Sequence, residues 1–222
     1  MAITTHPEVT APKPAAIAND VPVVALKRQT IDRVLVAFGA VLTVAFLVAG
    51  ALLTWGGNFS KDYVGDELSS QNIAFPPAAK LKEEGRSDLL KYADQAVDTG
   101  GEAEAYASYI NGHLQGIAGG ATYADLGAPE REAKAAVKAA QGGGATAAEV
   151  ADLQAKAAAL TGQRDTLFKG ETLRGLLLTA FAWSTVGRIA SLAAVGAFIA
   201  AGLMLMLVLL GVRHYRVVSR QS

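Results

Sequence analysis

Two long runs of this chain carry no charged side chain: VLVAFGAVLTVAFLVAGALLT at residues 34–54 and IASLAAVGAFIAAGLMLMLVLLGV at residues 189–212. As a helix with ~1.5 Å rise per residue, the first run is about 31 Å long, close to the thickness of the bilayer hydrocarbon. The second run is long enough to span the bilayer as a somewhat tilted helix. A buried core helix is the alternative for one such run, but two of them in 222 residues favour membrane spans. The 33 residues before the first run argue against a cleaved signal peptide. We therefore predict an integral membrane protein with two transmembrane helices.

The charges around these runs predict an orientation. Basic residues precede the first run and follow the second: Lys27, Arg28, Arg33, Arg213, Arg216 and Arg220. The segment between the runs, 55–188, holds 13 Lys+Arg and 17 Asp+Glu, a net charge of −4. Because positive charge next to a span marks the cytoplasmic side, we expect a multi-pass protein of the plasma membrane with both termini cytoplasmic and 55–188 outside. Arg188, at the outer edge of the second span, would reach the interface along its own aliphatic stem.

The composition excludes several classes of function. The chain has no cysteine, so it has no disulfide framework, thiol nucleophile or thiolate metal site. It has no phosphate-binding loop and no dinucleotide-binding glycine motif. Basic residues between the spans alternate with acidic ones, which argues against a nucleic-acid surface. We predict no cofactor.

The remaining segments predict an all-α fold, because alternating strand patterns are scarce and alanine is frequent. Residues 1–30 are predicted to be a disordered cytoplasmic tail, and 213–222 a basic cytoplasmic tail. Two prolines make 73–77 extended. We expect helices over 87–97, 102–117 and 129–141, with glycine pairs between them, and a further helix that starts at the Thr146–Glu149 capping box.

From this capping box a helix-packing seam runs toward the second span. Its members follow a spacing of three and four residues: Val150, Leu153, Ala157, Leu160 and Leu167. Arg164 interrupts the seam and Gly162 weakens the helix, so a sustained coiled coil is not expected. Whether 146–212 is one helix or bends near Gly162, Gly170 and Gly175 stays open at this point.

One histidine lies between the spans, within the tyrosine-rich stretch AYASYINGHLQGIAGGATYADLG at 105–127. On a helix His113 lies near the middle of an apolar and aromatic face that includes Tyr106 and Tyr109. Such a position favours a packed histidine in the core over a catalytic or metal-binding one. We take Tyr106, Tyr109, His113, Tyr123 and Asp125 as a candidate ligand-binding or structural cluster, and predict no catalytic and no metal-binding residue.

Several motifs occur together in this chain: a first span that ends at Trp55, an Ala-Tyr-Ala-x-x-Ile-x-x-His segment at 105–113, a Gly-x-Thr-Tyr-Ala-Asp-Leu segment at 120–126, and a small-residue-rich region at 181–202. The combination resembles a family of actinobacterial two-span membrane proteins of uncharacterised function, often named "aromatic ring-opening dioxygenase, LigA type". The resemblance covers both spans and the middle of 55–188, but neither the N-terminal tail nor 129–160. The name implies a non-haem ferrous site with two His and a carboxylate. Since only His113 lies between the spans, we expect no such site.

Small residues in both spans predict a helix-packing surface. They are Ala45 and Ala49 in the first span and Ala193, Gly196, Ala197, Ala200 and Ala201 in the second. Small side chains let helices approach closely in lipid. The two spans of one chain could use this surface, as could self-association or docking on another membrane protein. No ionisable residue lies within either span, which argues against a channel or transporter.

These observations favour a non-catalytic membrane protein whose extracytoplasmic helical domain scaffolds or modulates another membrane or envelope complex. The expected partners are the lipid bilayer and another membrane protein or a second copy. An extracytoplasmic ligand-binding or sensor module around the tyrosine–histidine cluster is the alternative. An iron-dependent ring-opening dioxygenase is the third hypothesis.

Overall fold

The computed structural model describes residues 28–218, and helices make up most of this part of the chain. The order is α1 (Arg28–Ser70), α2 (Ala78–Glu83), the 3₁₀ helix η1 (Ser87–Tyr92), α3 (Gly100–Ile117), α4 (Gly127–Gly142) and α5 (Ala147–Val218). Within the described residues there is no strand, only an isolated antiparallel bridge between Ala74 and Ala96. The predicted all-α class is confirmed.

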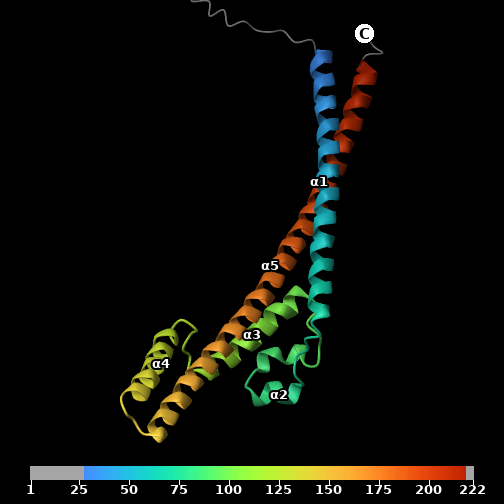
Figure 1. The fold of residues 1–222 in the computed structure, drawn as a ribbon. Helices are drawn as coiled ribbons and strands as arrows, with labels where there is room; N and C mark the ends of the chain where they lie inside the picture. Colours follow the sequence, from blue (N-terminus) through green and yellow to red (C-terminus); the bar gives the residue numbers. More distant parts are fainter. Residues whose placement is uncertain (1–27, 219–222) are drawn as a thin grey trace, which may run out of the picture.

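Helices α1 and α5 form a long hairpin, with the start of α1 and the end of α5 at the same end of the molecule (Figure 1). Helix α5 continues without a break through Gly162, Gly170 and Gly175, so the residues between the capping box and the second span form one rod. The predicted tail at 1–30 lies outside the described residues except for 28–30, which begin α1. Residues 213–218 of the predicted C-terminal tail belong to α5.

Both α1 and α5 are long and apolar enough to cross a membrane. Along these two helices, large apolar side chains such as Val34, Phe38, Leu52, Leu192 and Leu203 are more than half exposed. An exposed apolar surface of this extent is unusual for a monomer in water and normal for one in lipid. The prediction of two helices able to span a bilayer is confirmed in length and composition.

The hairpin seam repeats about every 3.5 residues and is lined by small side chains. On α1 it contains Gly39, Thr43, Gly50, Gly57 and Ser60, and on α5 it contains Gly187, Ala194 and Ala201. A Cβ atom added at Gly50 would lie 2.8 Å from the ring of Phe198, and one at Gly39 would lie 2.8 Å from Val208 Cγ2. The Ser60 hydroxyl donates a hydrogen bond to the Trp183 carbonyl at 2.7 Å. Close backbone approach therefore joins the two helices.

The contact between α1 and α5 uses only some of the predicted packing residues. Ala201 is buried, and Ala49, Ala197 and Ala200 are partly buried, but Ala45, Ala193 and Gly196 are exposed. The prediction followed small residues spaced four apart, a pattern that marks one face of a straight helix. Two helices that cross at a small angle instead alternate three- and four-residue steps, and this moves the contact to Ala194 and to the glycines of α1.

The part of the molecule beyond the apolar hairpin packs around α3, which lies against α5 (Figure 1). Its core joins Val64 and Leu68 of α1, Phe75, Leu81, Leu89 and Val97 of the connecting segments, Ala103, Ala107 and Tyr109 of α3, and Leu177 of α5. A second cluster holds Leu114, Leu126 and Leu167.

The local predictions for this region hold in part. Residues 75–77 are non-helical as the prolines require, and the Thr146 hydroxyl accepts a hydrogen bond from the Glu149 backbone N–H, as a capping box does. The predicted helix at 87–97 is wrong, because only η1 forms. Asp94 adopts a positive φ of 60°, and Val97 N–H donates to the Ile73 carbonyl, so the chain turns back onto the extended segment.

Candidate functional site

The predicted cluster is built on α3, whose start is fixed by a capping box. The Thr99 hydroxyl accepts from the Glu102 backbone N–H, and the Glu102 carboxylate accepts from the Thr99 backbone N–H. Gly100, predicted to break the chain, is the first residue of α3. A Cβ atom there would collide with Ser184 of α5, so glycine permits the close approach of the two helices.

Tyr106 and Tyr109 are part of the aromatic core. The Tyr106 ring meets Phe75 edge-on at a centroid distance of 5.2 Å and lies 5.5 Å from the Tyr109 ring. Burial, together with the neighbouring Glu84 carboxylate, raises the pKa of Tyr109 to about 12. Burial also raises the pKa of Tyr106. Both hydroxyls therefore stay protonated at neutral pH and act as neutral groups.

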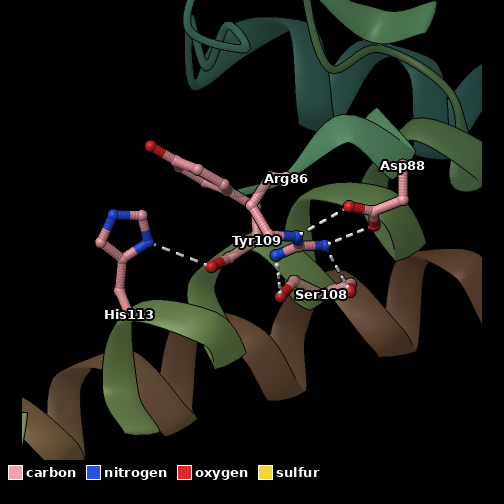
Figure 2. A network of polar contacts seen from close by, with 5 residues as sticks. All are labelled: Arg86, Asp88, Ser108, Tyr109 and His113. Carbon is pink, nitrogen blue, oxygen red and sulfur yellow. Dashed lines mark hydrogen bonds and ion pairs between the residues drawn. The ribbon is translucent and has the colours of Figure 1, made fainter. Parts of the chain in front are cut away.

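His113 is not in the core, contrary to the prediction: its side chain is 49% exposed. The imidazole ring packs edge-on against the Tyr109 ring, with 4.5 Å between the ring centroids. Its Nδ1 atom donates a hydrogen bond to the Tyr109 carbonyl at 3.1 Å (Figure 2). Nε2 lies 3.5 Å from Glu84 Oε1. Helix α5 covers only part of the apolar face of α3 that was predicted to hold His113. Leu114 lies in the covered part and enters the core, whereas His113 lies at its edge.

Tyr123 and Asp125 lie in the turn between α3 and α4 and have other partners. The Arg164 guanidinium stacks 4.1 Å above the Tyr123 ring, and Phe168 lies 5.7 Å from it. Asp125 accepts hydrogen bonds from the Thr122 backbone N–H and hydroxyl, which lower the pKa of this carboxyl. The structure thus brings Tyr106, Tyr109 and His113 together and gives Tyr123 and Asp125 a role in the turn.

The groups that complete the His113 site come from the segment between α2 and η1, which the sequence did not single out. Gly85, at a positive φ of 71°, ends α2 and leaves Glu84 next to His113. Arg86 donates to both Asp88 oxygens and, through Nη1 and Nη2, to the Ser108 carbonyl and hydroxyl (Figure 2). The ion pair lowers the pKa of Asp88. Arg86 therefore fastens this segment to α3.

An open hollow of about 330 Å³ lies between these elements. It is lined by Glu84, Arg86, Tyr109, Gly112, His113 and Gly116. The pKa of Glu84 is lowered, first by the neighbouring Tyr109 hydroxyl and next by Lys80, so Glu84 is ionised at neutral pH. A second hollow of about 380 Å³ shares Tyr109 and His113 with the first and is lined mainly by apolar side chains, among them Ile110, Leu114, Ile117 and Leu173.

A second polar cluster that the sequence did not predict joins α4 to α5. Glu130 has a side chain only 7% exposed, and accepts from Lys134, from the Thr161 hydroxyl at 2.8 Å and from Arg164 at 2.7 Å. These donors lower the pKa of Glu130 to about 2. Arg164, expected to interrupt the helix seam, is the residue that pairs with this buried carboxylate. The cluster has a structural role because Lys134, Thr161 and Arg164 all donate to the one buried carboxylate and so join α4 to α5.

The His113 site does not match the ferrous site that the resemblance implies. Within residues 28–218, no group of three or more His, Asp or Glu side chains is placed to hold a metal ion. His214 lies near the end of α5, far along the rod from α3 (Figure 1), and His6 is outside the described residues. The groups around His113 offer a carboxylate, an imidazole nitrogen and an aromatic wall, which suit binding of a hydrogen-bond donor.

Comparison of the chain with protein-family models, with curated proteins and with solved structures found no match. The resemblance to the actinobacterial two-span family therefore stays a prediction.

Proposed function

We propose that the chain is a non-catalytic two-pass protein of the plasma membrane, with both termini cytoplasmic and a helical domain outside that assembles with another membrane protein. The observation that carries the proposal is the apolar α1–α5 hairpin, whose outward side chains need lipid and whose helices continue into a charged, packed domain. In this arrangement the domain is held at a fixed angle to the membrane by two continuous helices.

The two ends of the hairpin support this orientation. At one end Arg33 donates a hydrogen bond from Nε to the Tyr215 hydroxyl at 2.9 Å, and its guanidinium lies 5.3 Å from the Tyr215 ring. Arg213 and Arg216 lie nearby on α5, which suits the cytoplasmic interface. At the other end Trp55, Phe59 and Tyr63 form an exposed stack with centroid distances of 5.8 and 5.9 Å. Aromatic side chains of this kind favour the membrane interface.

An exposed apolar face on α5 supports assembly with a partner. Outside the predicted span, Leu173, Leu176, Trp183 and Val186 are each more than half exposed, and a shallow hollow of about 330 Å³ lies beside Trp183. Ile189 and Leu192 of the predicted span, which lie farther round the helix, are exposed as well. A membrane protein with a helix that also extends out of the bilayer would cover both parts of this surface.

The orientation is tested by cysteine labelling, which is direct because the chain has no native cysteine. Thr30→Cys and Ala145→Cys each introduce one thiol at an exposed position near opposite ends of the molecule. With intact cells and a membrane-impermeant maleimide, we expect labelling of Ala145→Cys alone, and of both variants after the membrane is opened. Labelling of Thr30→Cys in intact cells would contradict the orientation.

The assembly is tested by purification from the native membrane in mild detergent, with the particle mass measured and co-purifying proteins identified. We expect a stoichiometric partner that is retained by Tyr63→Ser, a matched exposed position on α1, and lost from the double variant Leu176→Ser/Val186→Ser. A particle that contains only this chain, or a partner that both variants retain equally, would contradict the role of the α5 face.

A further inference from the structure

The hollow between α2 and α3 contains a buried acceptor that lacks a donor. The Glu84 side chain is 19% exposed, and its Oε2 atom is buried and accepts no hydrogen bond from any residue within 28–218. Its other oxygen, Oε1, lies 3.3 Å from Lys80 Nζ. A buried carboxylate oxygen without a donor is unfavourable, so the site is suited to a group that supplies one.

His113 adds a second acceptor beside the first. The Tyr109 carbonyl can only accept a hydrogen bond, so Nδ1 of His113 carries the proton that is shared with it. In the neutral imidazole Nε2 is then a bare lone pair, and it lies 3.5 Å from Glu84 Oε1. Two acceptors at this distance repel unless a donor lies between them. Protonation of His113 would satisfy Nε2 and Oε1 but would still leave Oε2 without a donor.

Three donor side chains surround this hollow, and none of them donates a hydrogen bond to Oε2: Lys80, Arg86 and the Tyr109 hydroxyl, whose proximity lowers the pKa of Glu84. Arg86 donates to Asp88 and Ser108, and Lys80 also lies 3.6 Å from Glu83. The second, mainly apolar hollow shares Tyr109 and His113 with the first as lining residues, so the two lie next to each other. The first hollow offers hydrogen-bond acceptors and a negative charge, and the second offers apolar side chains.

We propose that these two hollows bind a primary aliphatic amine in its ammonium form, with the nitrogen at Glu84 and His113 and the alkyl chain along Ile110, Leu114 and Leu173. An ammonium group has three donors and no acceptor, which matches two acceptors and a negative charge. The Tyr109 ring offers a wall that attracts a cation. A carboxylate ligand would meet Glu84 with like charge, and an alcohol would bring a single donor and no charge. This ligand site is independent of the partner assembly proposed above.

The test uses the full chain in detergent with n-hexylamine as the probe, measured by calorimetry and by NMR of the protein labelled with ¹⁵N in its histidines. Only three histidine signals are present, and the His113→Gln variant assigns the one of interest. We expect saturable binding of hexylamine, a shift of the His113 signal alone, and binding of n-hexanol and hexanoate that is about ten-fold weaker or absent.

Two matched variants locate the site. Glu84→Gln keeps the shape and removes the charge, and we expect it to weaken hexylamine binding by about ten-fold or more. Glu83→Gln removes the adjacent carboxylate, which also faces Lys80 but is 73% exposed and outside the hollow, and we expect no effect. Lys80→Met removes the competing ammonium of the chain, so binding should tighten. Unchanged circular dichroism spectra verify that each variant folds.

Equal binding to wild type and Glu84→Gln, a hexanol affinity equal to that of hexylamine, or a His113 signal that does not respond would each overturn the proposal. The partner assembly would be unaffected by any of these results, because it rests on the α5 face at Leu176 and Val186.

Discussion

At the scale of single residues, Leu114 and His113 show how one helical position separates core from surface. Leu114 packs into the space above Gly170 of α5, where a Cβ atom would collide with it. His113, one residue earlier, turns 100° away and lies at the rim of the hollow with Glu84. A glycine on the partner helix therefore decides which of two neighbouring side chains is buried.

We predict that Gly170→Ala destabilises the protein by about 1–3 kcal/mol, because the added methyl group meets the Leu114 side chain in a packed core. Gly162→Ala on the same helix is the matched control. Among the described residues, no heavy atom outside its own helix turn lies within 4 Å of a Cβ atom placed there. The control should stabilise the helix by up to about 1 kcal/mol.

Thermal unfolding of both variants in detergent, followed by circular dichroism, measures the difference. If Gly170→Ala unfolded at or above the wild-type temperature, the close contact between α3 and α5 would not be a determinant of stability.

At the scale of elements, α4 is held on α5 by a charged cluster rather than by a large apolar face. Glu130 supplies the buried charge, and Arg164 and Lys134 supply the donors. The helix is alanine-rich, and Ala133 is one of its few buried apolar side chains. Helix α4 should therefore depend on the ionisation of Glu130 more than the rest of the fold does.

This dependence predicts acid sensitivity. The pKa of Glu130 is lowered from 4.5 to about 2 in the folded state. A lowered carboxyl pKa stabilises the folded state at pH values above the unfolded pKa of 4.5, and that stabilisation is lost as the pH falls toward 2. We expect the protection of α4 amides, measured against the intrinsic exchange rate at each pH, to fall across this interval before the protection of α3 falls.

Glu130→Gln should show fast exchange in α4 already at pH 7, by about ten-fold, because Arg164 then lacks its carboxylate partner. The protection of α4 amides relative to intrinsic exchange should no longer change between pH 4.5 and 2. Glu132→Gln, at an exposed position of the same helix, is the control and should behave as wild type. Wild-type behaviour of Glu130→Gln would show that apolar contacts alone hold α4.

In the α1–α5 hairpin, two adjacent glycines allow a second comparison of a close helix contact with an open position. A Cβ atom at Gly57 would collide with Ser191 and lie 3.0 Å from the Gly187 carbonyl oxygen, whereas the chain described here places nothing within 4 Å of one at Gly56. We expect Gly57→Ala to lower the free energy of unfolding by about 1–3 kcal/mol, and Gly56→Ala to leave it unchanged or raise it.

Titration with sodium dodecyl sulfate, followed by circular dichroism, measures both variants. Equal unfolding midpoints for Gly57→Ala and Gly56→Ala would mean that α1 and α5 can move apart at Gly57 at little cost, and that close backbone contact there does not stabilise the hairpin.

At the scale of the whole molecule, α5 is the helix against which α1, α3 and α4 pack. It pairs with α1 in the hairpin, carries α3 along its middle and holds α4 near its start (Figure 1). If the hairpin spans a bilayer as we propose, a tilt of the hairpin would be transmitted to α3 and α4 as a rigid-body movement. In the proposed orientation, a partner bound to the exposed α5 face would contact the element against which α1, α3 and α4 all pack.

This arrangement predicts the depth of the two tryptophans. With Trp183→Phe, the emission of Trp55 in vesicles should be quenched more strongly by lipids brominated near the headgroup than by lipids brominated near the chain end, because Trp55 lies where the first apolar run stops. With Trp55→Phe, the remaining Trp183 should be quenched less, because in the proposed orientation it lies outside the membrane span. Strong quenching of Trp55 by the deep bromine would place the span boundary beyond residue 55.

The sequence by itself determined the features that depend on composition and short-range pattern. Two uncharged runs predict two spanning helices because the cost of burying charge in hydrocarbon leaves few alternatives. The Thr146 capping box and the extended proline segment also follow from neighbouring residues, through local hydrogen bonds and steric restriction. The helical face that carries Tyr106 and Tyr109 was predictable from a periodicity of 3.6 residues.

Only the tertiary structure decided which of these surfaces meet. The pairs His113 with Glu84, Arg164 with Glu130, and Leu114 with Gly170 join residues 29 or more positions apart, and their contact depends on the register and crossing angle of whole helices. The same geometry moved the hairpin seam from the predicted alanines to Gly39, Gly50 and Gly57. Periodicity shows which residues share one face of a helix. How much of that face a neighbouring helix covers depends on the distance between the two backbones, and packing sets that distance.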